Sequence, residues 1–176
     1  YPGGSYTYEW YYLNNCVLPT TTVGLNSTSI TPPTITNTRC YVRSVTDACG
    51  NTATSNTVTL TLTTPATANA GGPETVCQSS TPYALSGASI GGGATTGAWS
   101  ITSGSGTLSS TSQTASPAAV TFTPTTNGTV VLTLTTNDPD GAGPCTAATS
   151  TRTITVNQAP TVSAGGPDVV CQSSTP

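Results

Sequence analysis

Histidine, lysine and methionine are absent from the sequence, and only 5% of its 176 residues are charged. Without histidine there is no Ser-His or Cys-His pair for nucleophilic catalysis, and without lysine there is neither a Schiff base nor a Ser-Lys dyad. The six carboxylates are not visibly paired for acid–base work. We therefore expect no enzyme activity in these residues and no cofactor, apart from the calcium ion considered below.

Positive charge is scarce as well, because three arginines are the only cations and the net charge is −3. No basic stripe exists to attract a phosphate backbone, so nucleic-acid binding is disfavoured. No run approaches the roughly 18 consecutive apolar residues of a membrane-spanning helix, and no charged-then-apolar leader opens the sequence. We expect this segment neither to bind nucleic acid nor to insert into a membrane.

The sequence does contain a repeat. AGGPETVCQSSTP at residues 70–82 returns as AGGPDVVCQSSTP at residues 164–176, 94 residues further on. A period of this length is too long for a solenoid unit and fits one small β-domain. We expect an N-terminally incomplete domain at 1–64, a complete one at 65–157 and the start of a third at 158–176. Since both ends fall in mid-pattern, we expect an internal fragment of a longer protein.

Apolar residues alternate with threonine, and no segment has a 3.6-residue period, which predicts short β-strands. In the first domain we expect strands at 6–13, 39–46 and 57–62. One face of the first strand, with Tyr6, Tyr8, Trp10 and Tyr12, should be core. On the last strand, Val58, Leu60 and Leu62 should face inward.

The second domain should contain about seven short strands. We expect them near Val76 and at 83–85, 98–101, 120–122, 130–134 and 152–156, with glycine-rich turns such as Gly91-Gly92-Gly93 between them. Parallel strands would need crossover helices, which this composition does not favour. The predicted fold class is all-β, in the form of tandem, disulfide-braced immunoglobulin-like antiparallel sandwiches with Greek-key connections.

Each domain has one tryptophan ahead of a cysteine near its end. Trp10 precedes Cys49 much as Trp99 precedes Cys145. In an immunoglobulin-like sandwich a tryptophan of the third strand packs across the centre of the core. We therefore expect Trp10 and Trp99 to be core residues.

The six cysteines are best explained by disulfides, because zinc would need four thiolates and no C-x-x-C pair exists. In the second domain we expect Cys77 to bond to Cys145, a long loop closure worth roughly 4 kcal/mol. Disulfides imply an oxidising, extracellular compartment.

The remaining cysteines follow from the repeat. Cys49 corresponds to Cys145, so the partners of Cys49 and Cys171 are expected outside the fragment. Cys16 and Cys40 then form a further bridge within the first domain. A rival pairing joins Cys16 or Cys40 to Cys49, since sequence alone does not fix connectivity.

Two groups of carboxylates are candidate calcium ligands. Asp138 and Asp140 share the loop TNDPDGAGP, and hard oxygen ligands at alternate positions suit calcium. A Pro/Gly turn whose aspartates accept backbone amides without any metal is the favoured interpretation. Glu74 and Asp168 recur at a domain junction, where such a carboxylate binds calcium between domains or hydrogen-bonds the neighbouring domain.

The aromatic run near Trp10 has a second interpretation, as a sugar-stacking platform of a carbohydrate-binding module. Tyr11 faces outward in the predicted strand, and a groove with Tyr11 and Tyr12 would favour that interpretation. The N-glycosylation patterns at 26–28 and 127–129 are expected by chance in a chain so rich in Asn, Ser and Thr.

The repeated motif, with SGASIGGGATTGAWSI, NDPDGAGPCTA and the closing TRTITVN, resembles the tandem immunoglobulin-like or PKD-like repeats of very large Bacteroidota cell-surface proteins. Gliding-motility-associated adhesins are among them. The resemblance covers nearly all of 67–176, and 1–62 matches a looser relative of the repeat. It implies export by the type IX route and a role in stalks or surface filaments. The recurring cysteine and tryptophan of the family map onto Cys77, Cys145, Cys171 and Trp99.

We accordingly expect structural and adhesive repeat modules of a long extracellular protein, forming a stalk or fibre that presents a binding tip. Expected partners are neighbouring repeats of the same chain, surface glycans or other copies of the chain. One alternative is a carbohydrate-binding module of a secreted hydrolase. Another is a self-assembling filament subunit in which a strand is donated between chains.

Overall fold

A computed structural model describes residues 5–166 of the chain, which divides into two compact units, Tyr1–Thr64 and Pro65–Pro176. Regular structure in the described residues is almost entirely β, with one short 3₁₀ helix, η1 (Pro117–Ala119). The alternation of threonine with apolar residues, at a period of two, accounts for this. In this part of the chain, no helix has the length and apolar character needed to cross a membrane.

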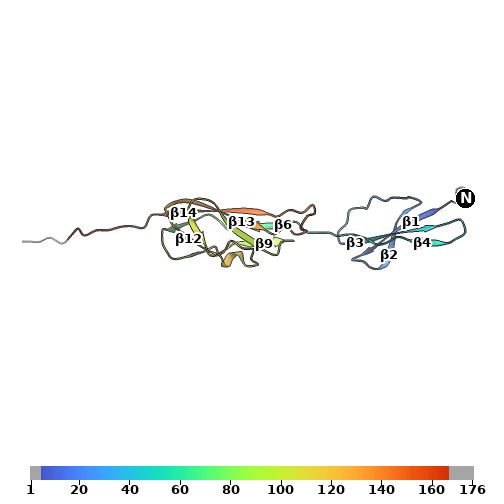
Figure 1. The fold of residues 1–176 in the computed structure, drawn as a ribbon, viewed down its shortest axis with the longest axis horizontal. Helices are drawn as coiled ribbons and strands as arrows, with labels where there is room; N and C mark the ends of the chain where they lie inside the picture. Colours follow the sequence, from blue (N-terminus) through green and yellow to red (C-terminus); the bar gives the residue numbers. More distant parts are fainter. Residues whose placement is uncertain (1–4, 167–176) are drawn as a thin grey trace, which may run out of the picture. The chain divides into compact units, whose positions relative to one another are not determined.

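Unit 1 is a single antiparallel sheet of five strands (Figure 1). The strands are β1 (Thr7–Asn14), β2 (Val17–Leu25), β3 (Arg39–Thr46), β4 (Thr52–Thr54) and β5 (Val58–Leu60). β1 pairs with β2 on one side and β3 on the other, and the free side of β3 is shared by β4 and β5. The sequence predicted β1, β3 and β5, whereas the return strand β2 was not expected.

The apolar face of this sheet is less covered than the sequence predicted. Tyr8, Trp10 and Tyr12 are half-buried rather than core, and Tyr6 is 57% exposed. Val58, Leu60 and Leu62, expected to face inward, are 57%, 39% and 47% exposed. These expectations required a second sheet over this face, and the described residues of unit 1 provide none.

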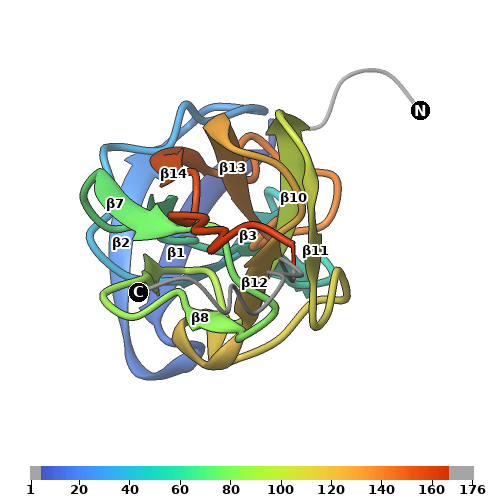
Figure 2. The same ribbon diagram turned by 90° about the vertical axis from the view of Figure 1, so that its left-hand side faces the viewer.

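Unit 2 is a sandwich with an immunoglobulin-like arrangement of strands. Its four-stranded sheet has the order β10 (Gly97–Ser103), β13 (Gly128–Thr136), β14 (Thr149–Asn157), β7 (Glu74–Cys77), and its three-stranded sheet has the order β11 (Gly106–Leu108), β12 (Thr121–Pro124), β8 (Tyr83–Ala84). β6 (Ala66–Asn69) pairs separately with β9 (Ser89–Gly92). In Figure 2, β7, β14, β13 and β10 follow one another across one layer of this unit, with β8 and β12 in the other.

The core of unit 2 lies between its layers and is made of alternate residues from facing strands. The buried residues are Ala70, Leu85, Ala88, Trp99, Val120, Phe122, Val130, Leu132, Leu134, Ile154 and Val156. The predicted fold class is therefore confirmed: the chain is all-β, with antiparallel sheets and an immunoglobulin-like sandwich. The exception to antiparallel pairing is β7, which runs parallel to β14.

Three strands of unit 2 were not predicted, namely β6, β9 and β11. The segment Gly91-Gly92-Gly93, expected to be a turn, instead ends β9. Gly92 has a φ of 64°, and a Cβ there would overlap the carbonyl oxygen of Pro65. Glycine is thus needed because β6 approaches β9 closely, which composition alone does not distinguish from a turn.

Candidate functional site

The first and last strands of the sheet in unit 2 lie side by side and point the same way. β7 pairs with β14 from Glu74, opposite Ile154, to Cys77, opposite Asn157. Because the chain enters before β7 and leaves after β14, a pull on the two ends of the unit drags these strands past each other. Their hydrogen bonds are then loaded together rather than one after another.

A buried arginine ties these two strands to the opposite layer. Arg152 lies on β14 and is 3% exposed. Its Nη2 donates to Glu74 on β7 and to the hydroxyl of Tyr83 on β8 (3.0 Å), and its Nη1 donates to the carbonyl oxygen of Ser86 (2.9 Å). Charge-assisted bonds of this kind are among the stronger ones in proteins.

Sequence reasoning missed the role of Arg152. The available signal was its place in TRTITVN, where it occupies an inward position of an alternating strand together with Ile154 and Val156. A charge at such a position needs a partner. The recurring carboxylate, Glu74, is that partner, so the structure gives this residue a role in holding the sandwich together.

The two tryptophans take equivalent places with different burial. Trp99 is 1% exposed, which confirms it as core, whereas Trp10 is half-buried. Each indole N–H donates to a backbone carbonyl of the segment that crosses over the sheet, Trp99 to Pro117 (2.9 Å) and Trp10 to Ser27 (3.1 Å). The two indoles are therefore held in the same way, although the sheets around them differ.

The half-covered face of unit 1 combines aromatic rings with guanidinium groups. The Cζ of Arg39 lies 4.0 Å from the ring centroid of Tyr12, and that of Arg43 lies 5.6 Å from Tyr8 and 5.7 Å from Trp10. Arg43 also donates to the carbonyl oxygen of Thr28. The buried Nε of Arg39 has no hydrogen-bond partner among the described residues. Both cations are thus held mainly by aromatic faces.

The sugar platform considered for Tyr11 and Tyr12 does not form. The two side chains lie on opposite faces of β1, because successive residues of a strand alternate. Tyr12 stands beside Tyr41, with ring centroids 6.0 Å apart. The Tyr11 hydroxyl donates to Glu9 (2.6 Å), and this bond to a carboxylate raises the pKa of Tyr11.

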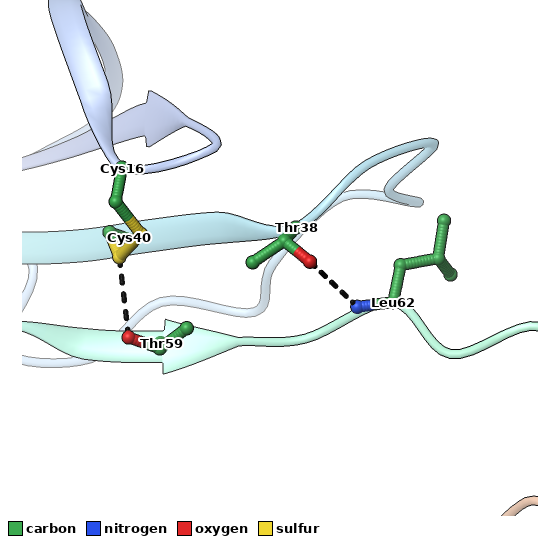
Figure 3. Close-up of a disulfide and its surroundings, with 5 residues drawn as sticks. All are labelled: Cys16, Thr38, Cys40, Thr59 and Leu62. Atoms are coloured by element: carbon green, nitrogen blue, oxygen red, sulfur yellow. Dashed lines mark hydrogen bonds between the residues drawn. A yellow bond between two sulfur atoms is a disulfide. The ribbon is translucent and has the colours of Figure 1, made fainter. Parts of the chain in front are cut away.

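The disulfide between Cys16 and Cys40 is present, as expected (Figure 3). It joins the turn between β1 and β2 to β3. The Cys40 sulfur also contacts the Thr59 hydroxyl of β5 at 3.3 Å, and the Leu62 amide donates to the hydroxyl of Thr38. Since Cys16 and Cys40 are bonded to each other, the rival pairing of either with Cys49 is excluded.

The predicted bond between Cys77 and Cys145 is wrong for this structure. Cys77 lies beside Asn157, at the end of β14, whereas Cys145 precedes the start of β14 at Thr149. A nine-residue strand places these ends roughly 26 Å apart, and a disulfide requires Cα atoms within about 7 Å. The error follows from the parallel pairing of β7 with β14, which puts the two cysteines at opposite ends of the sandwich.

Cys49 and Cys145 lie in similar loops. In each loop an aspartate carboxylate accepts a hydrogen bond from the backbone amide of the cysteine. The Cys49 amide donates to Asp47 (2.8 Å), which also binds the amide and side chain of Asn51. The Asn51 bonds above all hold the pKa of Asp47 below its ordinary value. The Cys49 thiol is exposed. That its partner lies outside the fragment stays a prediction, and Cys171 lies outside the described residues.

Asp138 and Asp140 adopt the turn geometry that was one of their two interpretations. Asp138 accepts the amides of Asp140 and Gly141, and Asp140 accepts those of Gly143 and Cys145, all at 3.1–3.2 Å. The bond from the Cys145 amide is the main cause that lowers the pKa of Asp140. Burial, reinforced by the charge of Asp140, raises the pKa of the Cys145 thiol.

The other calcium candidates are placed differently. Glu74 binds Arg152 inside its own unit, and Asp168 lies outside the described residues. Within residues 5–166, no group of three or more His, Cys, Asp and Glu side chains is positioned to hold a metal ion. The turn and the salt bridge account for the geometry of Asp138, Asp140 and Glu74, and calcium binding stays an untested hypothesis.

Two hollows on unit 2 are lined by apolar, hydroxyl and amide side chains. One of about 590 Å³ is lined by Ala98, Trp99, Ser100, Ile101, Gly106, Thr107, Leu108, Thr111 and Thr135. Another of about 560 Å³ is lined by Gln78, Ser79, Ser80, Thr123, Pro124, Thr125, Gln158, Ala159 and Thr161. Neither lining includes an acid, a base or a thiol among the described residues.

Two solved structures are distantly similar to this chain. The fibronectin(III)-like modules of CbhA from Clostridium thermocellum match at 10% identity and a TM-score of 0.36, over 85% of this chain and 78% of that one. The D00-D0 domain of intimin matches at 18% identity and a TM-score of 0.30, over 82% and 77%. No family model and no curated protein matches. The description as immunoglobulin-like modules therefore rests on the strand order of unit 2.

Proposed function

We propose that the chain consists of load-bearing repeat modules of a long extracellular surface protein, a stalk or fibre that presents a binding tip. The observation that carries this proposal is the parallel pairing of β7 with β14. β14 is the last described strand of unit 2, and β7 follows the short entry strand β6, which pairs with β9, so tension that passes beyond β6 loads the pair of β7 and β14.

The geometry favours resistance to a pull along the chain. In shear, all the bonds between two strands must fail nearly together, whereas in unzipping they fail singly. Arg152 adds a link across the same pair of strands through Glu74, and its bonds to Tyr83 and Ser86 tie that link to the second layer. The core beneath adds the resistance of close packing.

The repetition supports the same function. Each repeat has its own core or sheet, so under tension one repeat opens without loss of the others. The near absence of charge leaves faces of threonine, which attract few charged partners. The finer part of the proposal, a gliding-motility-associated adhesin of Bacteroidota exported by the type IX route, has its support in the repeat motif alone.

Single-molecule pulling tests this function. The chain is tethered through tags at its two ends, and the expected trace has separate unfolding events for the two units, with unit 2 the more resistant. Val76→Pro removes an amide donor from β7 and should lower the unfolding force of unit 2 clearly. Thr107→Pro, on the edge strand β11 away from the terminal strands, is the matched control and should lower it less.

Two results would contradict the proposal. One is that unit 2 opens at the same low force whether or not Val76 is replaced, with circular dichroism showing that both proteins are folded. The other is saturable glycan binding by the isolated chain on a glycan array, which would favour a carbohydrate-binding module of a secreted hydrolase.

A further inference from the structure

The described hydrogen-bond partners of Arg152 all belong to one early segment of unit 2. Arg152 lies on β14, whereas its partners lie on β7 (Glu74), on β8 (Tyr83) and in the turn after β8 (Ser86). Its Cζ also lies 5.7 Å from the centroid of the Tyr83 ring. Arg152 therefore links the last described strand of the unit to the segment 74–86.

The two charges of this link differ in their contact with water. The side chain of Arg152 is 3% exposed, and that of Glu74 is 41% exposed. The connection from β6 to β7 passes close to the guanidinium at Gly71, where a Cβ would lie 3.2 Å from Arg152 Nη1. Water therefore reaches the carboxylate of the pair but not the cation.

In the complete sandwich this ion pair should contribute little to the free energy of unfolding. The cost of taking charges out of water offsets most of their attraction, so apolar residues often replace a buried ion pair without loss of stability. The Nε of Arg152 adds to this cost, because it has no hydrogen-bond partner among the described residues. The global stability of unit 2 is thus a poor measure of what the pair does.

Detachment of β7 alone changes this balance. β7 is the border strand of its sheet, and among the described strands it pairs with β14 alone (Figure 2). Directly after β7, the amide of Gln78 donates to the carbonyl oxygen of Asn157 (2.7 Å). If β7 opened while the other strands stayed in place, Glu74 would leave with it and Arg152 would remain in the core without a carboxylate. An uncompensated buried charge is strongly unfavourable.

We infer that Arg152 and Glu74 form a latch for β7, which holds this strand in the sheet by making its separate detachment unfavourable. The pair raises the free energy of the partly opened state, in which the arginine is left alone, more than it lowers the free energy of the folded state. Under tension, the partly opened state of β7 and β14 is the state that the latch disfavours. This role in load bearing rests on the proposed function, whereas the latch itself does not.

Hydrogen exchange of the Gln78 amide, followed by NMR, tests the latch in the full chain. In the double variant Arg152→Met, Glu74→Gln neither charge is present, so no arginine is stranded when β7 detaches. The Gln78 amide should exchange at least about tenfold faster than in the unchanged chain. The urea midpoint of unit 2, followed by Trp99 fluorescence in a Trp10→Phe background, should stay the same or rise.

Two controls separate the latch from general loosening. The amide of Ser109 donates to the carbonyl oxygen of Thr121 (2.9 Å) in the other layer, and its exchange should be the same in the double variant as in the unchanged chain. Val120→Ala removes buried atoms of the core away from β7. It should lower the urea midpoint of unit 2 and leave the exchange of the Gln78 amide unchanged.

Glu74→Gln alone decides the question if the double variant does not fold. Arg152 then lacks its carboxylate in the folded state as well, so the detachment of β7 carries no extra penalty. The Gln78 amide should again exchange faster while the Ser109 amide does not, and here the urea midpoint should fall.

Three results would overturn the inference. The Gln78 amide could exchange at its original rate in the variants, or the Ser109 amide could speed up together with it. Finally, the urea midpoint of the double variant could fall, which would mean that the pair stabilises the whole unit rather than the attachment of β7. None of these results decides the pulling comparison of Val76→Pro with Thr107→Pro, which tests the proposed function separately.

Discussion

Three strands pair in the same order in the two units, β1, β3 and β5 in unit 1 and β10, β13 and β14 in unit 2, but their interiors differ. Where Leu134 lies opposite Trp99 in unit 2, Arg43 lies opposite Trp10 in unit 1, and where Leu132 lies opposite Ile101, Tyr41 lies opposite Tyr12. Unit 2 has an aliphatic core between two layers, whereas unit 1 has a face of arginines on aromatic rings over one sheet. The paired positions are the same in the two units, but the side chains at these positions differ in chemistry.

This comparison shows what a second layer contributes. In unit 2 three inward side chains of β14, those of Arg152, Ile154 and Val156, are at most 3% exposed, and the charged one, Arg152, has a salt bridge and two further partners. In unit 1 the apolar side chains of β5 remain exposed, and a disulfide joins the strands instead. Burial and a covalent link are alternative ways to hold a small β-unit together.

The largest expected effect comes from equivalent residues of the last strands. Ile154→Ala should lower the free energy of unfolding of unit 2 by about 2–5 kcal/mol, because it opens a cavity in a closed core. Leu60→Ala should cost unit 1 less than about 1 kcal/mol, because this side chain is 39% exposed. Urea titration measures both, with Trp99 as reporter in a Trp10→Phe background and Trp10 in a Trp99→Phe background. Equal losses of unfolding free energy in the two variants would contradict the difference in packing between the two units.

The next effect concerns the covalent link. Replacing both Cys16 and Cys40 by serine should destabilise unit 1 by roughly 2–4 kcal/mol, since a loop with a sequence separation of 24 residues is released in the unfolded state. Unit 2 should change by less than about 0.5 kcal/mol, because distant sites act independently. The same single-tryptophan urea titrations report this. A comparable loss in unit 2 would show that the two units do not fold separately.

A smaller effect sharpens the contrast in packing. A Cβ at Gly106 would overlap the Phe122 ring, so Gly106→Ala should cost unit 2 about 1–3 kcal/mol. At Gly24 the nearest atom to such a Cβ is Ile30 Cδ1 at 3.5 Å, an ordinary contact, so Gly24→Ala should change unit 1 by less than about 0.5 kcal/mol. Differential scanning calorimetry of the two variants measures this. A tolerated alanine at Gly106 would mean that the core of unit 2 is looser than described.

The smallest effect is on pH dependence, and it should be alike in the two units. The pKa values of Asp47 and Asp140 are lowered, so their contributions are present above the ordinary aspartate pKa of 3.8. These contributions are lost as the pH falls through the lowered values. In the Asp47→Asn variant the melting temperature of unit 1 should fall less on acidification than in the unchanged chain. Asp140→Asn should have the same effect on the melting temperature of unit 2. Unchanged acid profiles in both variants would show that these loops contribute nothing.

Sequence periodicity predicted the strands that carry strong alternation, such as β3, β13 and β14. The repeat alignment predicted the bond between Cys16 and Cys40, and the position of Trp99 ahead of Cys145 predicted its burial. Periodicity did not predict β6 and β9, because a strand of glycine and small residues, held by close backbone approach, has the composition of a turn.

The errors in the site have a common origin. Alternation shows which residues share a face, but not whether another layer covers that face, so Val58, Leu60 and Leu62 were assigned inward. Repeat alignment shows which cysteines are equivalent, but not at which end of the sandwich they lie. Cys77 and Cys145 were therefore paired although the parallel register of β7 and β14 separates them. Whether a face is covered, and at which end of the sandwich a cysteine lies, both depend on long-range strand order. A local sequence pattern does not show that order.

The most direct measurement is hydrogen exchange of the backbone amides in dilute, monomeric chain, followed by NMR. The account predicts that every amide from 154 to 156 in β14 is protected, because both edges of that strand are paired. In β5, protection should alternate from residue to residue, because only the edge toward β3 is paired. Continuous protection along β5, or rapid exchange along β14, would contradict it.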